Sequence, residues 1–223
     1  NGIHLFNTTG ALIEGNDISE TRDAIYIETA NRNTIRDNVM SDLRYGIHYM
    51  YSMHNLLENN VTRGTRTGYA LMQSKYLKVF NNRSENDENY GILMNFITNS
   101  ELRNNVVTGV SQGQSAGVII SGAEGKAVFI YNSLYNTFEG NYFGHSNIGI
   151  HLTAGSEENQ VFNNAFVENQ RQVKYVATRT QSWAEDGKGN YWSDYLGWDR
   201  NQDGLGDVPY EPNDNVDRLL WKY

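Results

Sequence analysis

The sequence contains no cysteine and only two proline residues among its 223 residues. The absence of cysteine excludes disulfides, zinc-thiolate sites and thiol catalysis, and it is compatible with an oxidising compartment. No apolar run approaches the roughly 20 residues that a membrane-spanning helix needs. A chain of this length can form one sizeable domain or two small ones, and it can bury a hydrophobic core without disulfides or structural metal sites.

Basic residues are also scarce, since 18 Lys and Arg stand against 26 Asp and Glu and the formal net charge is −8. A protein that binds nucleic acid must neutralise phosphates with Lys and Arg. The charge therefore argues against a nucleic-acid partner. It suits a surface that handles cations, although only weakly.

Glycine and asparagine are abundant, and both recur in register. Short segments of the form Gly/Ala-apolar-x-apolar begin at regular positions, the first four of which are 22 residues apart. The starts are Gly2, Ala24, Gly46, Gly68, Gly91, Gly117 and Gly149. A repeat of this length indicates a solenoid.

Asparagine forms a second column, which follows most of these starts by 14 or 15 residues. Its members are Asn16, Asn38, Asn60, Asn82, Asn105, Asn141 and Asn164. Another Asn precedes four of them by five residues, at Asn33, Asn55, Asn136 and Asn159. Asn at a bend is explained by turn chemistry and by amide-to-amide bonds between stacked rungs, so we assign these residues a structural role.

Alternation of apolar and polar residues over four to six positions is typical of strands. A 22-residue coil of short strands is one rung of a parallel β-helix, in which rungs stack about 4.8 Å apart. The sequence predicts an all-β protein, a right-handed parallel β-helix of about seven 22-residue rungs with a C-terminal cap. Asn38, Asn60 and Asn82 should stack on one another.

Two departures from the period predict loops on neighbouring rungs. The distance from Asn105 to Gly117 is four residues longer than expected, and the distance from Gly117 to Asn141 is ten residues longer. The extra residues fall in 109–114 and within 122–131. Such insertions either bind partners or are tolerated decoration, and the sequence does not separate the two.

The repeat signature ends at about Arg171, and all four tryptophans lie beyond it, at Trp183, Trp192, Trp198 and Trp221. A solenoid needs its open apolar end covered. We therefore expect residues 1–171 to form the rungs and residues 172–223 to form a Trp-rich capping segment.

One motif in that segment resembles a calcium loop. Oxygen-bearing residues occupy positions 1, 3, 5 and 9, Gly204 is at position 6, and position 7 offers a backbone carbonyl. The predicted ligands are Asp199, Asn201, Asp203, Leu205 and Asp207. Position 12 is Tyr210 rather than Glu, so the alternatives are a structural calcium site and a metal-free turn.

A second candidate site consists of methionine and histidine. The strand register places His4, His48 and His151 in one outward column, and Met50 and Met72 in another on adjacent rungs. Thioether and imidazole ligands select copper, particularly Cu(I). The candidate copper ligands are His48, Met50, Met53, His54 and Met72. The alternative is a set of scattered surface residues, or methionines that pack under a loop.

Parallel β-helices also include polysaccharide lyases and hydrolases, which place carboxylates or basic residues together on one sheet. The predicted outward columns of this chain carry no such cluster. We therefore expect no enzymatic activity, and we keep a carbohydrate-active β-helix, whether lyase, hydrolase or epimerase, as the alternative.

Three features together resemble the NosD family. They are the 22-residue rungs, the segment Tyr45-Gly46-Ile47-His48-Tyr49-Met50-Tyr51-Ser52, and the ending from Gly189-Asn190-Tyr191-Trp192-Ser193-Asp194-Tyr195 through Trp198-Asp199 to Asp207-Val208-Pro209-Tyr210. The rungs are shared with many β-helix proteins, whereas the Gly-Asn-Tyr-Trp ending is more specific. The similarity covers essentially the whole chain.

This resemblance implies a periplasmic, non-catalytic scaffold that helps to assemble the copper centres of nitrous oxide reductase. It also implies docking to that reductase, to the subunits of an ABC transporter and to a membrane-anchored copper chaperone, with membrane contact only through these partners. Copper would be bound transiently. No motif of the family assigns ligands residue by residue, so the copper ligands rest on the register argument.

Overall fold

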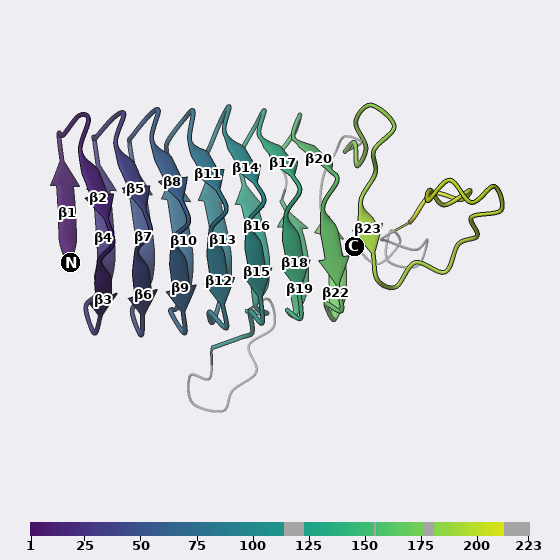
Figure 1. Ribbon diagram of the computed structural model, residues 1–223, viewed down its shortest axis with the longest axis horizontal. Coiled ribbons are helices and arrows are strands. Elements are labelled where there is room, and N and C mark those ends of the chain that lie inside the picture. Colours follow the sequence, from purple (N-terminus) through teal and green to yellow (C-terminus); the bar gives the residue numbers. More distant parts are fainter. Residues whose placement is uncertain (114–122, 154, 176–180, 212–223) are drawn as a thin grey trace.

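The computed structural model describes residues 1–113, 123–153, 155–175 and 181–211. These residues form a parallel β-helix with three sheets that run along its long axis (Figure 1). The predicted all-β solenoid is therefore confirmed. None of the described residues belongs to a helix, so none of them forms a helix able to cross a membrane.

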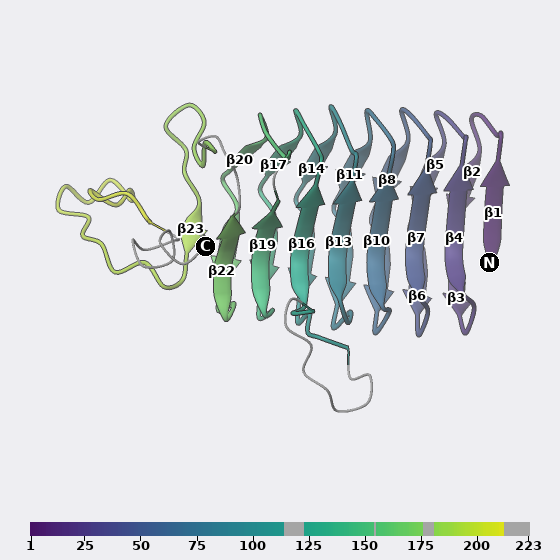
Figure 2. The same cartoon turned by 180° about the vertical axis from the view of Figure 1, so that it is seen from behind.

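The first sheet has eight strands, and these lie side by side along the molecule (Figures 1 and 2). They are β1 (Ile3–Phe6), β4 (Asp23–Glu28), β7 (Tyr45–Met50), β10 (Thr67–Met72), β13 (Tyr90–Asn95), β16 (Lys126–Tyr131), β19 (Ile148–Leu152) and β22 (Arg171–Tyr175). Seven rungs were predicted. The eighth strand, β22, was missed because it lacks the Gly/Ala start of the others.

The other two sheets consist of three-residue strands, apart from a last strand of two residues. The second sheet contains β2 (Leu12–Glu14), β5 (Thr34–Arg36), β8 (Leu56–Glu58), β11 (Lys78–Phe80), β14 (Glu101–Arg103), β17 (Thr137–Glu139) and β20 (Gln160–Phe162). The third contains β3 (Asp17–Ser19), β6 (Val39–Ser41), β9 (Val61–Arg63), β12 (Arg83–Glu85), β15 (Val106–Thr108), β18 (Tyr142–Gly144), β21 (Ala165–Val167) and β23 (Tyr191–Trp192).

One predicted rung was wrong. The strand after β13 is β16, with Ala127-Val128-Phe129-Ile130 in the place assigned to Gly117-Val118-Ile119-Ile120. The extra residues therefore all fall in one stretch of sequence between β15 and β16, instead of in two insertions on neighbouring rungs. Residues 117–120 lie outside the described part of the chain.

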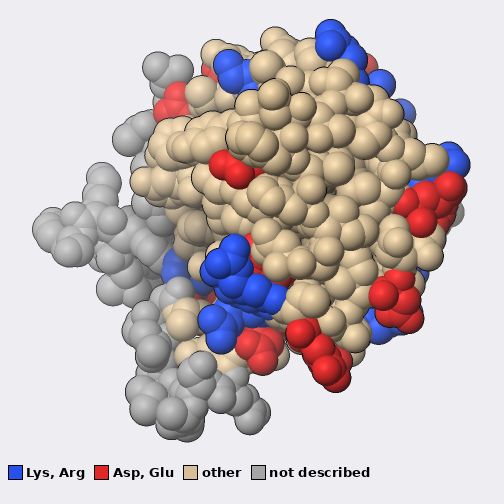
Figure 3. All heavy atoms as spheres, turned by 90° about the vertical axis from the view of Figure 1, so that its left-hand side faces the viewer, with Lys and Arg blue, Asp and Glu red and all other residues tan. Residues whose placement is uncertain are grey.

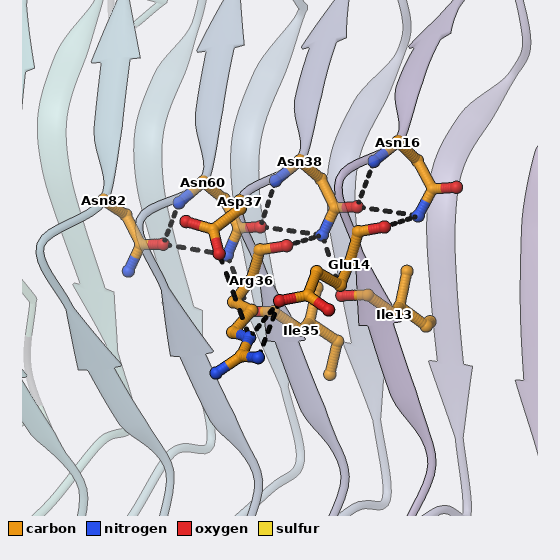
Figure 4. A network of polar contacts seen from close by, with 9 residues as sticks. All are labelled: Ile13, Glu14, Asn16, Ile35, Arg36, Asp37, Asn38, Asn60 and Asn82. Carbon is orange, nitrogen blue, oxygen red and sulfur yellow. Dashed lines mark hydrogen bonds and ion pairs between the residues drawn. The ribbon is translucent and has the colours of Figure 1, made fainter.

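The predicted asparagine ladder is confirmed at the bend between the second and third sheets (Figure 4). The Oδ1 atom of Asn60 accepts bonds from both the backbone N and the Nδ2 of Asn38, at 3.2 and 3.0 Å. Asn82 does the same for Asn60. Because each side chain satisfies buried backbone of the preceding rung, the column specifies the register of the stack.

The residue before each ladder asparagine explains why the chain bends there. Asp37, Asn59 and Asn81 have φ angles of 55°, 54° and 56°. This left-handed conformation costs most residues roughly 1–2 kcal/mol, but Gly, Asn and Asp adopt it with little strain. A residue in the left-handed conformation followed by a ladder Asn is thus the local sequence feature that forms this bend.

The small residues at the strand starts have a packing cause. A Cβ atom on Gly46 would lie 2.5 Å from Cγ2 of Thr62 and 2.6 Å from the carbonyl oxygen of Gly68. The first and third sheets therefore approach each other closely at this column. Glycine therefore fits at Gly46, and the smallest side chain, alanine, stands at the equivalent position of two other rungs, at Ala24 and Ala127.

The core is a set of stacked apolar columns with one polar interruption. Ile, Leu, Val and aromatic side chains point inward from all three sheets. In the third sheet, Thr62 and Ser84 replace them and donate to the buried carboxylate of Asp87, both at 2.6 Å. Burial raises the pKa of Asp87, while the hydrogen bonds from Ser84, Thr62 and Thr65 oppose that shift.

The two ends of the solenoid differ. Seen from the β1 side, the end face carries few Lys, Arg, Asp and Glu side chains except around its rim (Figure 3). At the other end the chain leaves the solenoid after β23 (Figure 1). There the Trp192 ring stacks on Phe166, with ring centroids 4.4 Å apart, and Tyr210 stacks on Trp192 at the same distance.

Candidate functional site

Three of the candidate copper residues, His48, Met50 and Met72, lie on the outer face of the first sheet. Strand pairing places His4, Tyr26, His48, Ala70, Leu93, Phe129 and His151 in one column. The predicted alignment of His4, His48 and His151 is therefore confirmed. We call the part of this face formed by β4, β7 and β10 the His/Met face.

Aromatic rings stack along this column at its N-terminal end. The ring of Tyr26 lies between those of His4 and His48, with centroid separations of 4.8 and 4.6 Å. Tyr45 contacts His48 edge-on at 4.9 Å. These contacts hold the His48 imidazole in place within the stack.

A buried carboxylate lies beside that ring. Asp23 is 0% exposed, and one of its oxygens is 3.3 Å from Nδ1 of His48. Arg44 donates to both carboxylate oxygens of Asp23, from Nε and Nη2, at 3.0 Å each. The guanidinium of Arg44 also lies over the Tyr45 ring at 4.4 Å. Sequence reasoning missed this triad, because Asp23 stands before the Ala24 start of the repeat pattern and belongs to no motif.

The second nitrogen of His48 has no partner. Nε2 is buried and makes no hydrogen bond within the described residues. Burial lowers the pKa of His48, with the hydrogen bond to Asp23 opposing the shift, so the ring is neutral near pH 7. A buried polar atom left unpaired costs roughly 1–3 kcal/mol. An unpaired imidazole lone pair is also a metal ligand.

Two thioethers lie on the same strand as this imidazole or on the neighbouring strand of the sheet. Met50 and Met72 are direct partners in the pairing of β7 with β10, and both side chains are partly exposed. The hydroxyl of Tyr26 donates to Sδ of Met50 at 3.4 Å. Burial, together with the charge of Glu28, raises the pKa of Tyr26, so this hydroxyl keeps its proton.

Met53 and His54 belong to a different ladder. The chain turns at Tyr51, which has a φ of 52°, and Met53 then pairs with Lys75 of the next rung. The His54 ring stacks on Tyr76 at 4.7 Å. The structure therefore groups His48, Met50 and Met72 on one face, and it places Met53 and His54 beyond the corner.

His151 provides a contrast within the same column. Its Nδ1 is also buried without a hydrogen-bond partner in the described chain. Burial, followed by the positive charges of Lys174 and Lys126, lowers its pKa to about 4. Neighbouring cations disfavour a bound metal ion, so His151 is a poorer ligand than His48, which has a carboxylate beside it.

The calcium-like loop is exposed, and its carboxylates accept bonds from its own backbone. Asp199 accepts from the N–H groups of Asp203 and Gly204, at 3.2 and 3.0 Å. Asp207 accepts from the N–H of Arg200 at 2.8 Å. Over the part of the chain that the structure describes, no three His, Asp or Glu side chains converge as around a metal ion.

Acidic residues also line a cleft of about 530 Å³ near the C-terminal end of the solenoid. Glu157, Glu158 and Glu185 contribute to its wall, together with Tyr135 and Tyr175. The sequence analysis did not identify this cleft, because its walls come from turns and from the segment after β22. It is the place where the carbohydrate-active alternative finds carboxylates and aromatic rings together.

A family model and two curated relatives of this chain carry the same family name. A family model described as "Periplasmic copper-binding protein (NosD)" matches residues 1–197. "Probable ABC transporter binding protein NosD" from Stutzerimonas stutzeri is 64% identical over 224 residues, which cover 100% of this chain and 51% of that protein. The protein of the same name from Pseudomonas aeruginosa is 65% identical over 223 residues, which cover 100% and 52%. The chain thus spans about half the length of these curated relatives.

Among solved structures, QnrB1, a plasmid-mediated fluoroquinolone resistance protein, aligns with 70% of this chain and 84% of its own. The sequence identity is 13% and the TM-score is 0.20, and this comparison carries no argument about fold or function.

Proposed function

Because the chain belongs to the NosD family of periplasmic copper-binding proteins, we propose that its His/Met face holds Cu(I) during copper delivery to nitrous oxide reductase. In this role the β-helix is a non-catalytic scaffold. Copper is its cargo rather than a resident cofactor.

One observation supports the choice of face above all others. His48 presents a buried, unpaired nitrogen, and Met50 and Met72 are register partners within the same pair of strands. One imidazole and two thioethers are soft ligands of the kind that select Cu(I).

Partial exposure of the two methionines favours transient binding. A metal ion that must pass from one protein to another needs an open route, and a closed cage would retain it. The face offers one buried imidazole nitrogen and two partly exposed thioethers on a rigid sheet, so a bound ion is reached from the side of the methionines, which suits hand-over better than storage.

The partners follow from the names of the relatives and from the family resemblance. We propose that the full-length protein docks on ABC transporter subunits, a copper chaperone and the reductase. We expect the full-length protein to co-purify with the transporter subunits from solubilised membranes. The interaction should survive the double change of Met50 and Met72 to Leu, because docking and copper binding use different chemistry. If the variant no longer co-purifies with the transporter subunits, docking and copper binding depend on the same residues, which contradicts this proposal.

The loop from Asp199 to Asp207 is proposed to bind calcium in a structural role, with oxygens from Asp199, Asn201 and Asp203, the Leu205 carbonyl and Asp207. Calcium at about 100 times its Kd should then stabilise the fold by about 2.7 kcal/mol. The shift in melting temperature on adding calcium should vanish in Asp203→Ala. Equal melting of the wild type with calcium and with chelator would leave the metal-free turn as the explanation.

The carbohydrate-active alternative has one observation in its favour, the cleft lined by Glu157, Glu158 and Glu185. We expect the purified chain to leave a panel of acidic and neutral polysaccharides uncleaved, as measured by the release of reducing ends. If the chain cleaves a polysaccharide and Glu157→Gln or Glu185→Gln abolishes this cleavage, the carbohydrate-active function is favoured over the copper-handling function.

A further inference from the structure

The unusual feature of the His/Met face is that both nitrogens of His48 are buried, yet only one has a partner. Nδ1 faces Asp23 at 3.3 Å, and Nε2 faces no hydrogen-bonding group among the described residues. The environment therefore distinguishes the two nitrogens, and this distinction decides where the ring carries its proton.

The proton position follows from the bonds of Asp23. An ionised carboxylate only accepts hydrogen bonds, and Asp23 already accepts two from the guanidinium of Arg44. The group that meets it from His48 must then donate. Nδ1 of His48 carries the proton, and Nε2 is left with its lone pair.

We propose that Asp23 is a positioning residue, which fixes His48 in the tautomer whose Nε2 binds the soft cation that Met50 and Met72 also ligate. The proposal rests on the copper-handling role proposed above. In metal sites generally, a carboxylate that accepts from one ring nitrogen orients the imidazole and makes the other nitrogen a better ligand.

Two further contacts tie the sulfur to this imidazole. The ring of Tyr26 stacks on His48 at 4.6 Å, while its hydroxyl reaches Sδ of Met50 at 3.4 Å. Tyr26 thus contacts both groups at once. On the next rung, Ala70 follows His48 in its column, and it is the smallest side chain of that column.

The test uses the chain as it is, labelled with ¹⁵N at histidine. Long-range proton–nitrogen spectra of the metal-free protein should show His48 protonated at Nδ1. Cu(I), added under ascorbate and argon, should shift the Nε2 resonance of His48 and leave its Nδ1 proton in place. A metal-free His48 with its proton on Nε2 overturns the proposal.

The matched variant is Asp23→Asn, which keeps the shape of the side chain. The oxygen of Asp23 that faces Nδ1 of His48 also accepts from Nη2 of Arg44. An amide NH₂ at that place donates to Nδ1 of His48 and moves the ring proton to Nε2, and it gives up the bond from Nη2, while the amide oxygen still accepts from Nε of Arg44. Loss of a carboxylate that orients a metal-binding histidine costs about 10- to 100-fold in affinity. Asp37→Asn, the same change at an exposed position, should bind Cu(I) as the wild type does.

The outcomes separate the two proposals. If Asp23→Asn binds Cu(I) as tightly as the wild type, the positioning role is wrong, and the copper-handling role stands. If the wild type does not bind Cu(I), both are wrong. If Asp23→Asn does not fold, the tautomer and the Nε2 shift of the wild type decide alone.

Discussion

Replacing Asn60 by Ala is expected to lower the free energy of unfolding by about 4 kcal/mol. The side chain of Asn60 accepts from the backbone N–H of Asn38 and donates to the carbonyl oxygen of Ile35, both inside the stack. Alanine leaves these two buried groups unpaired, at roughly 1–3 kcal/mol each, and it also leaves a small void. For a chain of this size the melting temperature should fall by roughly 10 °C.

The matched control is Asn16→Ala, at the end of the same ladder. Nδ2 of Asn16 donates to Asn38, but in the described chain nothing donates to its Oδ1. We expect a loss below about 1 kcal/mol, because little is left unpaired there. Thermal unfolding followed by circular dichroism compares the two variants. An equal decrease in the free energy of unfolding for Asn60→Ala and Asn16→Ala would show that the buried hydrogen bonds of the ladder do not stabilise the stack.

Replacing Met50 and Met72 together by Leu is expected to weaken Cu(I) binding by about 100-fold or more, since direct ligands contribute more than the 10- to 100-fold of their supporting groups. Leucine keeps the volume and removes the sulfur, and neither side chain lines the core. Anaerobic titration against a Cu(I)-specific chelator measures the affinity. In a denitrifying strain, full-length protein with both changes should yield copper-deficient nitrous oxide reductase.

Two methionines that face inward provide the control. Met40 and Met94 are fully buried, so Met40→Leu with Met94→Leu applies the same chemical change to the core. This pair should bind Cu(I) normally and lose only a little stability. If the Met50 and Met72 variant still matures fully loaded reductase, the face is an ordinary surface, and the contribution of the protein is docking alone.

The sequence predicted the solenoid because its corners and close approaches repeat the same local chemistry in every rung. The Asn at each bend, the left-handed residue before it and the small residue at the strand start each have a local cause, so they leave a periodic trace. Such features are readable without knowledge of the tertiary contacts.

The misplaced rung shows where this logic fails. Gly117-Val118-Ile119-Ile120 matches the strand pattern as well as any true start, while Ala127-Val128-Phe129-Ile130 carries Ala in the place of Gly. A pattern of four residues does not distinguish a strand from an insertion. The distance from Ala127 to Asn141 is the usual 14 residues, and this count was the available signal.

The candidate site was readable only in part. Register alone placed His48 in its column and paired Met50 with Met72, because side chains in strands alternate between faces. Met53 and His54 were added to the site because they are close to Met50 in sequence, but the chain turns at Tyr51 and carries them away from the sheet. The contact of Asp23 with His48 depends on side-chain direction, which periodicity does not encode.

X-ray absorption at the copper edge tests the central claim most directly. The protein loaded with one equivalent of Cu(I) should show two sulfur ligands and one imidazole nitrogen, and the sulfur scattering should disappear when Met50 and Met72 are both Leu. A Cu(I) site that keeps the same sulfur ligands in that variant, or that shows only nitrogen and oxygen ligands in the wild type, would contradict the assignment of the His/Met face.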